Sequence, residues 1–341
     1  MCSSLASDDG FISLSRTLTQ MLDAVVMGSA FVELTPTKMK VSLSEVGSFN
    51  LGVGGSAANI SVALSRLGTN VGLISAVGND DLGAYVLGAL GSDRVNTSRV
   101  KRVTGSRTGL SLYSVDSRGT KTYHFYRFPG YSAPESTLSL KDLDRKYVSS
   151  AKALVLGEAS VRQRPSRDLA EAAVRIAKSQ GSLVLYDPNF RSSLWSNKDE
   201  AAEITRRFVS LASIVTPNAR EALLITGRRS VESAIEDLMK LCGGVVAVKQ
   251  ADEGCTVGTQ HEITRFPAFR IHAVDDTGAG DAFAAGLLAG MLRGLRTPDA
   301  AVLASAVAAL KVSALGTAQA MPTLKAVKRF LHLKKVTIPM L

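Results

Sequence analysis

Between residues 150 and 250, short apolar runs alternate with longer stretches in which apolar residues recur at helical spacing. The apolar runs predict strands near 153–156, 182–186, 213–215 and 244–248, and the longer stretches predict helices near 166–180, 199–211, 218–226 and 230–241. Strands joined by helices of this length pair in parallel through right-handed crossovers. The pattern therefore predicts an α/β fold with a parallel central sheet and helices on both of its faces.

The first 150 residues follow a less regular pattern. Asp23–Gly28 predicts a buried strand that ends in a glycine turn, and Ile60–Gly68 predicts an amphipathic helix ended by glycine. The stretches 38–53 and 105–127 alternate apolar and polar side chains, which is typical of half-exposed strands. The second of them contains a turn at Asp116–Gly119, so we expect a hairpin there.

A segment that is apolar on nearly all sides, Ala282–Met291, follows a glycine-rich turn at Asp275–Asp281. As a helix it should lie buried between its neighbours. Gly286 and Gly290 each disfavour the helix by about 1 kcal/mol relative to alanine, so we expect another backbone to approach closely there. The turn places free N–H groups at the start of this helix, where the helix dipole favours an anion such as phosphate.

Asp281 lies in the first turn of this apolar helix, beside the expected anion site. A carboxylate at this position can simply complement the helix dipole. The whole string D-D-T-G-A-G-D favours a second role, because phosphoryl transfer to a hydroxyl needs both an anion cradle and a base that accepts the proton. We therefore assign Asp281 as the candidate base, and the backbone of Gly278, Ala279, Gly280 and Asp281 as the candidate anion hole.

This string resembles the C-terminal signature of the ribokinase-like (phosphofructokinase-B type) carbohydrate kinases. Gly54-Gly55-x-x-x-Asn59 resembles the sugar-binding glycine pair and asparagine of the same family. Gly78–Gly83 completes the family's N-terminal signature, and within it we expect Asp81 to act mainly as a helix cap.

The resemblance covers residues 23–335 and implies one ribokinase-like kinase domain, in which a small β-sheet lid includes segments 38–53 and 105–127. Residues 1–22 are expected to form a flexible extension. The implied activity is ATP-dependent phosphorylation of a sugar or sugar acid, with the 2-keto-3-deoxygluconate kinases and fructokinases as the most similar branch. A homodimer formed through the lid is a further expectation.

The resemblance implies that the sugar is bound by Glu33, Gly54, Gly55, Asn59, Thr108, Tyr126, Arg127, Arg191 and Asp281. Arg127 and Arg191 suit an acidic sugar, because guanidinium–carboxylate contacts can be bidentate. They can also pair with protein carboxylates such as Asp187 or Glu33, and the substrate would then be a neutral ketose. We favour a sugar acid over fructose, with ribose or a nucleoside as alternative substrates within the family.

In a parallel sheet, ligands bind beyond the carboxyl ends of the strands. This rule selects 187–191, 216–221 and Lys249, and Asn218-x-x-Glu221 matches a family motif associated with magnesium and phosphates. A helix cap explains the same pair of residues. The resemblance implies that ATP is bound by Asn218, Glu221, Lys249, Gly254, Thr277, Gly278 and Gly280, with Mg²⁺ held by Glu221 through water.

The resemblance also implies a potassium ion beside the anion hole. Its ligands would be Asp275 and the loop 313–320, which lies between predicted helices near 298–313 and 323–333. Potassium is then expected to raise turnover. The chain departs from the family pattern at Ala251, where a glycine is usual, and at Asp276, where a small hydroxyl residue is usual.

Composition narrows the remaining possibilities. Apolar residues make up 45% and charged residues 21% of the 341 residues, and no stretch reaches the roughly 18 apolar residues of a membrane span. Residues 1–20 resemble neither a secretory signal nor a transit peptide. Cys2, Cys242 and Cys255 are dispersed, which indicates a reducing, cytoplasmic location. The net charge of +10 accompanies no nucleic-acid-binding motif, so we expect no nucleic-acid partner.

Two other classes of function remain open. Gly52-x-Gly54-x-x-Ala57 fits a relaxed dinucleotide-binding fingerprint, which would indicate a nicotinamide-dependent oxidoreductase. That interpretation ranks second, because the preceding segment is half polar and because it leaves 275–281 without a role. A sugar-binding regulator that kept the fold and lost the chemistry is the third, and the presence of Asp281 disfavours it.

Overall fold

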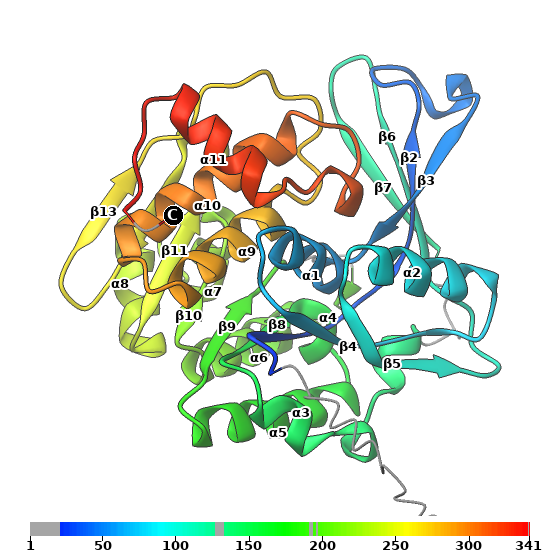
Figure 1. Cartoon of the computed structure of the whole chain (residues 1–341), viewed down its shortest axis with the longest axis horizontal. Helices are drawn as coiled ribbons and strands as arrows, with labels where there is room; N and C mark the ends of the chain where they lie inside the picture. The colour runs from blue at the N-terminus through cyan, green and yellow to red at the C-terminus, as the bar shows by residue number, and fades with distance from the viewer. Residues whose placement is uncertain (1–20, 127–132, 191–193, 196, 340) are drawn as a thin grey trace, which may run out of the picture.

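The computed structural model describes residues 21–126, 133–190, 194–195, 197–339 and 341. Within them the strands form a nine-stranded sheet, in the order β13-β12-β11-β10-β9-β8-β1-β4-β5, and a separate four-stranded sheet, in the order β3-β2-β6-β7. The small sheet projects from the upper right of the molecule, beside helices α1 and α2 (Figure 1).

In the large sheet, the seven strands from β11 to β5 pair in parallel, which confirms the predicted parallel centre. The last two strands, β12 and β13, extend it as an antiparallel hairpin. The strands are β1 (Ala24–Met27), β4 (Val71–Gly78), β5 (Asn96–Val103), β8 (Ala153–Gly157), β9 (Leu183–Asp187), β10 (Ile214–Val215), β11 (Val245–Lys249), β12 (Cys255–Gly258) and β13 (Ile263–Phe266).

Helices cover both faces of this sheet, as predicted, and the central strands are apolar on both sides. In β1, Ala24 and Val26 pack into one hydrophobic cluster, whereas Val25 and Met27 pack into the other. The first cluster includes residues of α1 (Ser56–Arg66), α2 (Asp81–Ser92), α9 (Ala279–Leu292), α10 (Thr297–Val312) and α11 (Leu324–Leu333). The second includes residues of α3 (Arg145–Ser149), α4 (Glu158–Val161), α5 (Ser166–Ser179), α6 (Lys198–Leu211), α7 (Ala219–Thr226) and α8 (Val231–Cys242).

Helix α9 is the buried helix predicted from 282–291, and it packs along α10. A Cβ atom added to Gly286 would lie 2.7 Å from the Cα of Ala304, and one added to Gly290 would lie 2.9 Å from the Cβ of Ala300. These distances confirm that the two glycines allow close helix contact. In the described part of the chain, no helix is long and apolar enough to cross a membrane.

The small sheet differs in detail from the predicted lid. It consists of β2 (Phe31–Pro36), β3 (Phe49–Gly54), β6 (Leu110–Val115) and β7 (Lys121–Tyr126). The predicted hairpin is present as β6 and β7. The stretch 38–53 is not one strand, because a short 3₁₀ helix at Leu43–Glu45 precedes β3.

The N-cap residue of α2 also differs from the prediction. Asp80, rather than Asp81, is the N-cap residue, and its carboxylate accepts a hydrogen bond from the N–H of Gly83 at 2.8 Å. Asp81 is the first residue of the helix proper, and it is exposed.

Candidate active site

A pocket lies between the carboxyl ends of β1 and β8, the N-termini of α1 and α9, and strand β7 of the small sheet. It has about 710 Å³ of empty volume, part of it open to solvent. Its described lining is Gly28, Ser29, Phe31, Glu33, Gly55, Ser56, Ala57, Asn59, Tyr123, Phe125, Gly157, Glu158, Ala159, Asn189, Leu194, Thr277, Gly278 and Asp281. The structure therefore brings Glu33, Gly55, Asn59, Gly278 and Asp281, all predicted site residues, to one cavity.

Asp281 lies in the first turn of α9, with only 6% of its surface exposed. Its Oδ1 accepts a hydrogen bond from the Ser56 hydroxyl at 2.6 Å, and its Oδ2 accepts one from the Asn59 amide at 2.8 Å. Burial and the charge of Asp187 raise the pKa of Asp281 to about 6, against the opposing effect of the two hydrogen bonds. A carboxylate with this pKa is ionised at neutral pH and is still basic enough to take a proton.

Two more predicted sugar ligands, Asn59 and Glu33, line the same pocket. The Oδ1 atom of Asn59 is buried, and no hydrogen-bond partner for it is present among the described residues. Glu33 on β2 is also buried, and its Oε1 accepts a hydrogen bond from Thr317 at 2.8 Å. Burial raises the pKa of Glu33 to about 7. Gly54 is packed against Glu33, because a Cβ atom there would lie 2.9 Å from the Glu33 Cβ.

The turn before α9 has the geometry of an anion hole. Gly278, its N-cap residue, has φ of +78°, a left-handed conformation that favours glycine. The Ala279 N–H donates to the Asp276 carbonyl, whereas Gly280 and Asp281 lie in the first turn, where a helix leaves N–H groups without intrahelical acceptors. The Lys249 ammonium lies against Gly280, 3.2 Å from where a Cβ atom would be. Partial and full positive charges therefore converge on this turn.

Lys249 ends β11, at the predicted edge of the sheet, and pairs with Asp187 at the end of β9. Its Nζ lies 2.9 and 3.1 Å from the two Asp187 oxygens. Burial lowers the pKa of Lys249, but Asp187 and Glu221 raise it by more, so this ammonium stays charged. The pair holds a cation next to the anion hole.

Asn218 and Glu221 form a capping box at the start of α7. The Asn218 side chain accepts from the Glu221 N–H at 2.9 Å, and Glu221 Oε2 accepts from the Asn218 N–H at 2.8 Å. The second oxygen, Oε1, accepts from the Phe190 N–H at 2.8 Å. Burial raises the pKa of the Glu221 carboxyl. Both residues thus cap the helix.

Several predicted ligands lie elsewhere. Thr108 does not line the pocket: its hydroxyl donates to Asp80 at 2.6 Å and accepts from the Gly78 N–H at 2.9 Å, which argues against substrate binding. Tyr126 ends β7, is 49% exposed and is not among the pocket residues. Arg127 and Arg191 lie outside the described residues.

The loop after β11 shows what the backbone requires at Ala251, where this chain departs from the family pattern. Ala251 has φ of +53°, a left-handed conformation that disfavours residues with a Cβ, so this position does suit a glycine. Gly254 has φ of +98°, and a Cβ atom there would lie 2.0 Å from the Phe266 carbonyl. Gly254 is therefore needed for packing against β13.

Some site residues were missed in the sequence. Glu158 directly follows β8 and pairs with Arg162 at 2.7 Å, so the strand-end rule that selected 187–191 also finds it. Ser56 lies within the glycine-rich stretch before Asn59, but serine there carried no distinct signal. Lys121 could not be found from the sequence, because its contacts depend on how the small sheet folds over the anion hole.

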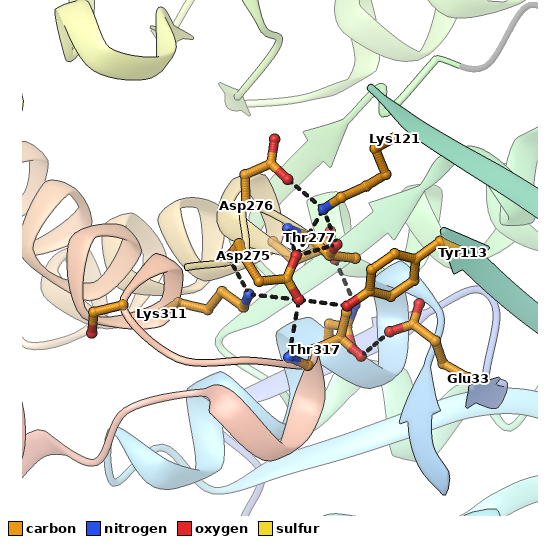
Figure 2. A network of polar contacts seen from close by, with 12 residues as sticks. Glu33, Tyr113, Lys121, Asp275, Asp276, Thr277, Lys311 and Thr317 are labelled. Carbon is orange, nitrogen blue, oxygen red and sulfur yellow. Dashed lines mark hydrogen bonds and ion pairs between the residues drawn. The ribbon is translucent and has the colours of Figure 1, made fainter. Parts of the chain in front are cut away.

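Asp275 is surrounded by hydrogen-bond donors of this chain (Figure 2). Its Oδ1 accepts from Lys121 at 2.7 Å and from the Thr277 hydroxyl at 2.6 Å, and its Oδ2 accepts from the Tyr113 hydroxyl at 2.7 Å. The buried Lys311 ammonium donates to the Asp275 carbonyl at 2.7 Å. Burial raises the pKa of Asp275, but Lys311 and Lys121 lower it far more. A potassium ion held by Asp275, as predicted from the resemblance, does not fit this set of donors.

Comparison with known proteins defines the family. The family model described as "pfkB family carbohydrate kinase" matches residues 21–324. The chain belongs to the pfkB family of carbohydrate kinases. The 5-dehydro-2-deoxygluconokinase of Clostridium perfringens is 31% identical to this kinase over 320 residues, which cover 92% of this chain and 94% of the relative. "Probable fructokinase-7" of Arabidopsis thaliana is 30% identical over 317 residues, which cover 90% of this chain and 92% of that protein.

A fructokinase double mutant from Vibrio cholerae O395, solved with fructose, ADP and potassium ion bound, is similar to this kinase in structure. The TM-score is 0.80 at 25% identity, and the match covers 91% of this chain and 99% of that chain. These matches confirm the family and the fold predicted from the sequence. They also exclude the oxidoreductase interpretation, as does the position of Gly52 and Gly54 in β3 of the small sheet rather than after a central parallel strand.

Proposed function

We propose that this pfkB family kinase transfers the γ-phosphate of ATP to a hydroxyl group of a sugar or sugar acid, with Asp281 as the general base. The observation that carries the proposal is the environment of Asp281. This carboxylate, with a pKa of about 6, lies in the first turn of α9, lines the pocket and is held there by hydrogen bonds from Ser56 and Asn59. A base and an anion hole within one turn are what phosphoryl transfer requires.

In this mechanism, the sugar lies in the pocket with the reacting hydroxyl against Asp281. Glu33 and Asn59, which both line the pocket, bind other hydroxyl groups of the sugar. Asp281 takes the proton as the oxygen attacks the γ-phosphorus, the bond between this phosphorus and the β,γ-bridging oxygen breaks, and ADP leaves. The N–H groups of Gly280 and Asp281, with the nearby Lys249 ammonium, stabilise the negative charge of the phosphoryl group in transit.

ATP and Mg²⁺ are the proposed cofactors. ATP phosphates would approach the anion hole from the side of Lys249, over the ends of β10 and β11. No cluster of three potential metal ligands is present in the described ranges. Mg²⁺ usually keeps several waters and binds substrate phosphates, and Glu221 would hold it through water. Mg²⁺ supplies charge neutralisation on the phosphates when bound.

The substrate class is the finer part of the proposal. The named relatives point to a keto sugar acid or to fructose. The described pocket lining includes Glu33, Glu158 and Asp281 and contains no lysine or arginine. Arg127 and Arg191, the partners predicted for a substrate carboxylate, lie outside the described residues. We keep the sugar acid as the first choice. The test is kcat/KM for 5-dehydro-2-deoxygluconate, 2-keto-3-deoxygluconate and fructose, in wild type and in Arg191→Ala.

A carboxylate-reading site should lose roughly 2–3 kcal/mol of discrimination for the acid in Arg191→Ala, because a charged hydrogen-bond donor is removed. A wild-type preference for fructose, or an unchanged ratio, would overturn the sugar-acid assignment and leave the kinase assignment intact. Sugar binding without ADP release would instead favour the regulator. A cytoplasmic location and a homodimer through the small sheet remain predictions.

A further inference from the structure

Lys311 is a buried charge that the proposed mechanism does not use. It is the penultimate residue of α10, its exposed fraction is 0%, and the helix around it is rich in alanine, valine and leucine. Burial lowers its pKa to about 8, against the opposing effect of Asp275. A lysine in such a place must be compensated by close partners, since an unpaired ammonium would strongly destabilise the fold.

The partner of Lys311 is the segment that leads into the anion hole. The Lys311 Nζ donates to the Asp275 carbonyl at 2.7 Å and lies 4.0 Å from Asp275 Oδ2 (Figure 2). That oxygen also accepts from the N–H of Gly316, in the loop after α10, at 3.0 Å. The N–H groups of Val274 and Asp275 in turn donate to the Val312 carbonyl. The ammonium therefore lies between α10, the loop that follows it and the anion-hole turn.

This is the place where the family resemblance led us to expect a monovalent cation. A potassium ion and an ammonium group carry the same single charge, have similar sizes and bind to carbonyl and carboxylate oxygens. An ion in contact with both the Asp275 carbonyl and Oδ2 would have to share the space that Lys311 Nζ fills. The other carboxylate oxygen, Asp275 Oδ1, accepts a hydrogen bond from Lys121 Nζ, so both oxygens face a cation of the protein itself.

We propose that the Lys311 ammonium replaces the monovalent cation beside the anion hole, so that this kinase turns over without potassium. The inference rests on the proposed phosphotransferase function. Its physical basis is that a tethered cation holds the Asp275 backbone and the loop at Gly316 in place at every salt composition. A free ion would do so only when bound.

The first test compares initial rates of the wild type in potassium chloride and in tetramethylammonium chloride, at equal ionic strength and saturating Mg²⁺. We expect rates that agree within about twofold. Lys311→Ala should be slower by roughly 10- to 100-fold in tetramethylammonium, because a charged hydrogen bond is lost, and potassium should restore much of that rate. Lys325→Ala removes an exposed lysine on α11 and should behave as wild type in both salts.

A second readout does not depend on activity. Potassium should raise the Tm of Lys311→Ala but not that of the wild type, relative to tetramethylammonium. Crystals soaked in thallium(I), which mimics potassium, should show an anomalous peak beside Asp275 in the variant and none in the wild type. If no sugar is phosphorylated in any salt, the proposed function fails while these two measurements still decide the cation site.

Two results would overturn the inference. One is a wild type that potassium activates several-fold or that binds thallium beside Asp275. The other is a folded Lys311→Ala that potassium neither stabilises nor reactivates. Should Lys311→Ala not fold, Lys311→Met keeps most of the side-chain volume and should be slow in both salts, and the wild-type comparison stands without any variant.

Discussion

Replacing Asp281 with asparagine should slow the kinase and stabilise its fold at the same time. The pKa of Asp281 is raised from 3.8 to about 6, first by burial and then by Asp187. At about 1.4 kcal/mol per pKa unit, the ionised carboxylate costs the folded state about 3 kcal/mol at pH 7.5. Asparagine removes this charge and can keep both hydrogen bonds, accepting from Asn59 and donating to the Ser56 hydroxyl. The gain should therefore approach, without exceeding, that figure.

The sign of the pH dependence follows from the direction of the shift. Between about pH 4 and pH 6 the folded wild type binds more protons at Asp281 than the unfolded chain does, so this group destabilises the fold above about pH 6 and ceases to do so below about pH 4. The stability advantage of Asp281→Asn should therefore be largest above about pH 6 and should vanish near pH 4. Urea unfolding across this range measures it.

The kinetic half of the prediction is a fall in kcat of about 10²–10⁴-fold, with sugar affinity nearly unchanged, because the variant lacks a general base. ADP release under saturating ATP measures it. Asp199→Asn, an exposed carboxylate in the first turn of α6, is the matched control and should change neither property. A variant that keeps more than about half of the wild-type kcat shows that Asp281 is not the base. A stability difference that is constant with pH shows that the buried charge is not its source.

Lys249→Met should raise the KM for ATP and move the acidic limb of the kcat/KM–pH profile to higher pH, because the Lys249 ammonium lowers the pKa of Asp281; an unmoved limb would contradict this coupling. Glu33→Gln should raise the sugar KM more at pH 8 than at pH 6, because the pKa of Glu33 is about 7 and its protonated form resembles glutamine; equal effects at both pH values would argue against it. Gly55→Ala should lower the free energy of unfolding by about 2–4 kcal/mol, since its Cβ would lie 2.4 Å from a backbone carbonyl oxygen at φ of +99°. Gly91→Ala, in open space on α2, should instead be neutral or stabilise by up to about 1 kcal/mol, and a similar loss in both variants would show that close packing is not the cause.

Hydrophobic periodicity was enough to predict the helices that pack against one face of the large sheet. The helix predicted at 166–180 is α5 (Ser166–Ser179), and the one predicted at 230–241 is α8 (Val231–Cys242). Both have one apolar stripe against the second hydrophobic cluster. The stretch 38–53 failed because alternation alone does not distinguish a strand from an irregular, exposed segment.

The part of the candidate site that is formed by residues adjacent in the sequence could be predicted. Residues 275–281 form one turn that contains both the anion hole and Asp281, so the motif alone determines how they lie relative to each other. The contacts of Thr108 and Lys121 could not be predicted in this way. Thr108 bonds to Asp80 and Lys121 bonds to Asp275, and both partners are distant in sequence. Lys311 does carry a signal in the sequence. A lysine among the buried positions of an apolar helix needs a partner in the interior.

The connectivity of the small sheet has a consequence for how this protein folds and how it can be engineered. Strands β2 and β6 pair in parallel, with Val32 opposite Leu110, although α1, β4, α2 and β5 intervene along the chain. Bringing together two strands so far apart in the sequence is slow, because it costs chain entropy. Contacts offset that entropy cost only once the intervening elements have packed. The small sheet should thus gain protection from hydrogen exchange after the large sheet during refolding. It cannot be excised or exchanged as a continuous cassette, and a graft would have to replace residues 31–54 and 110–126 together.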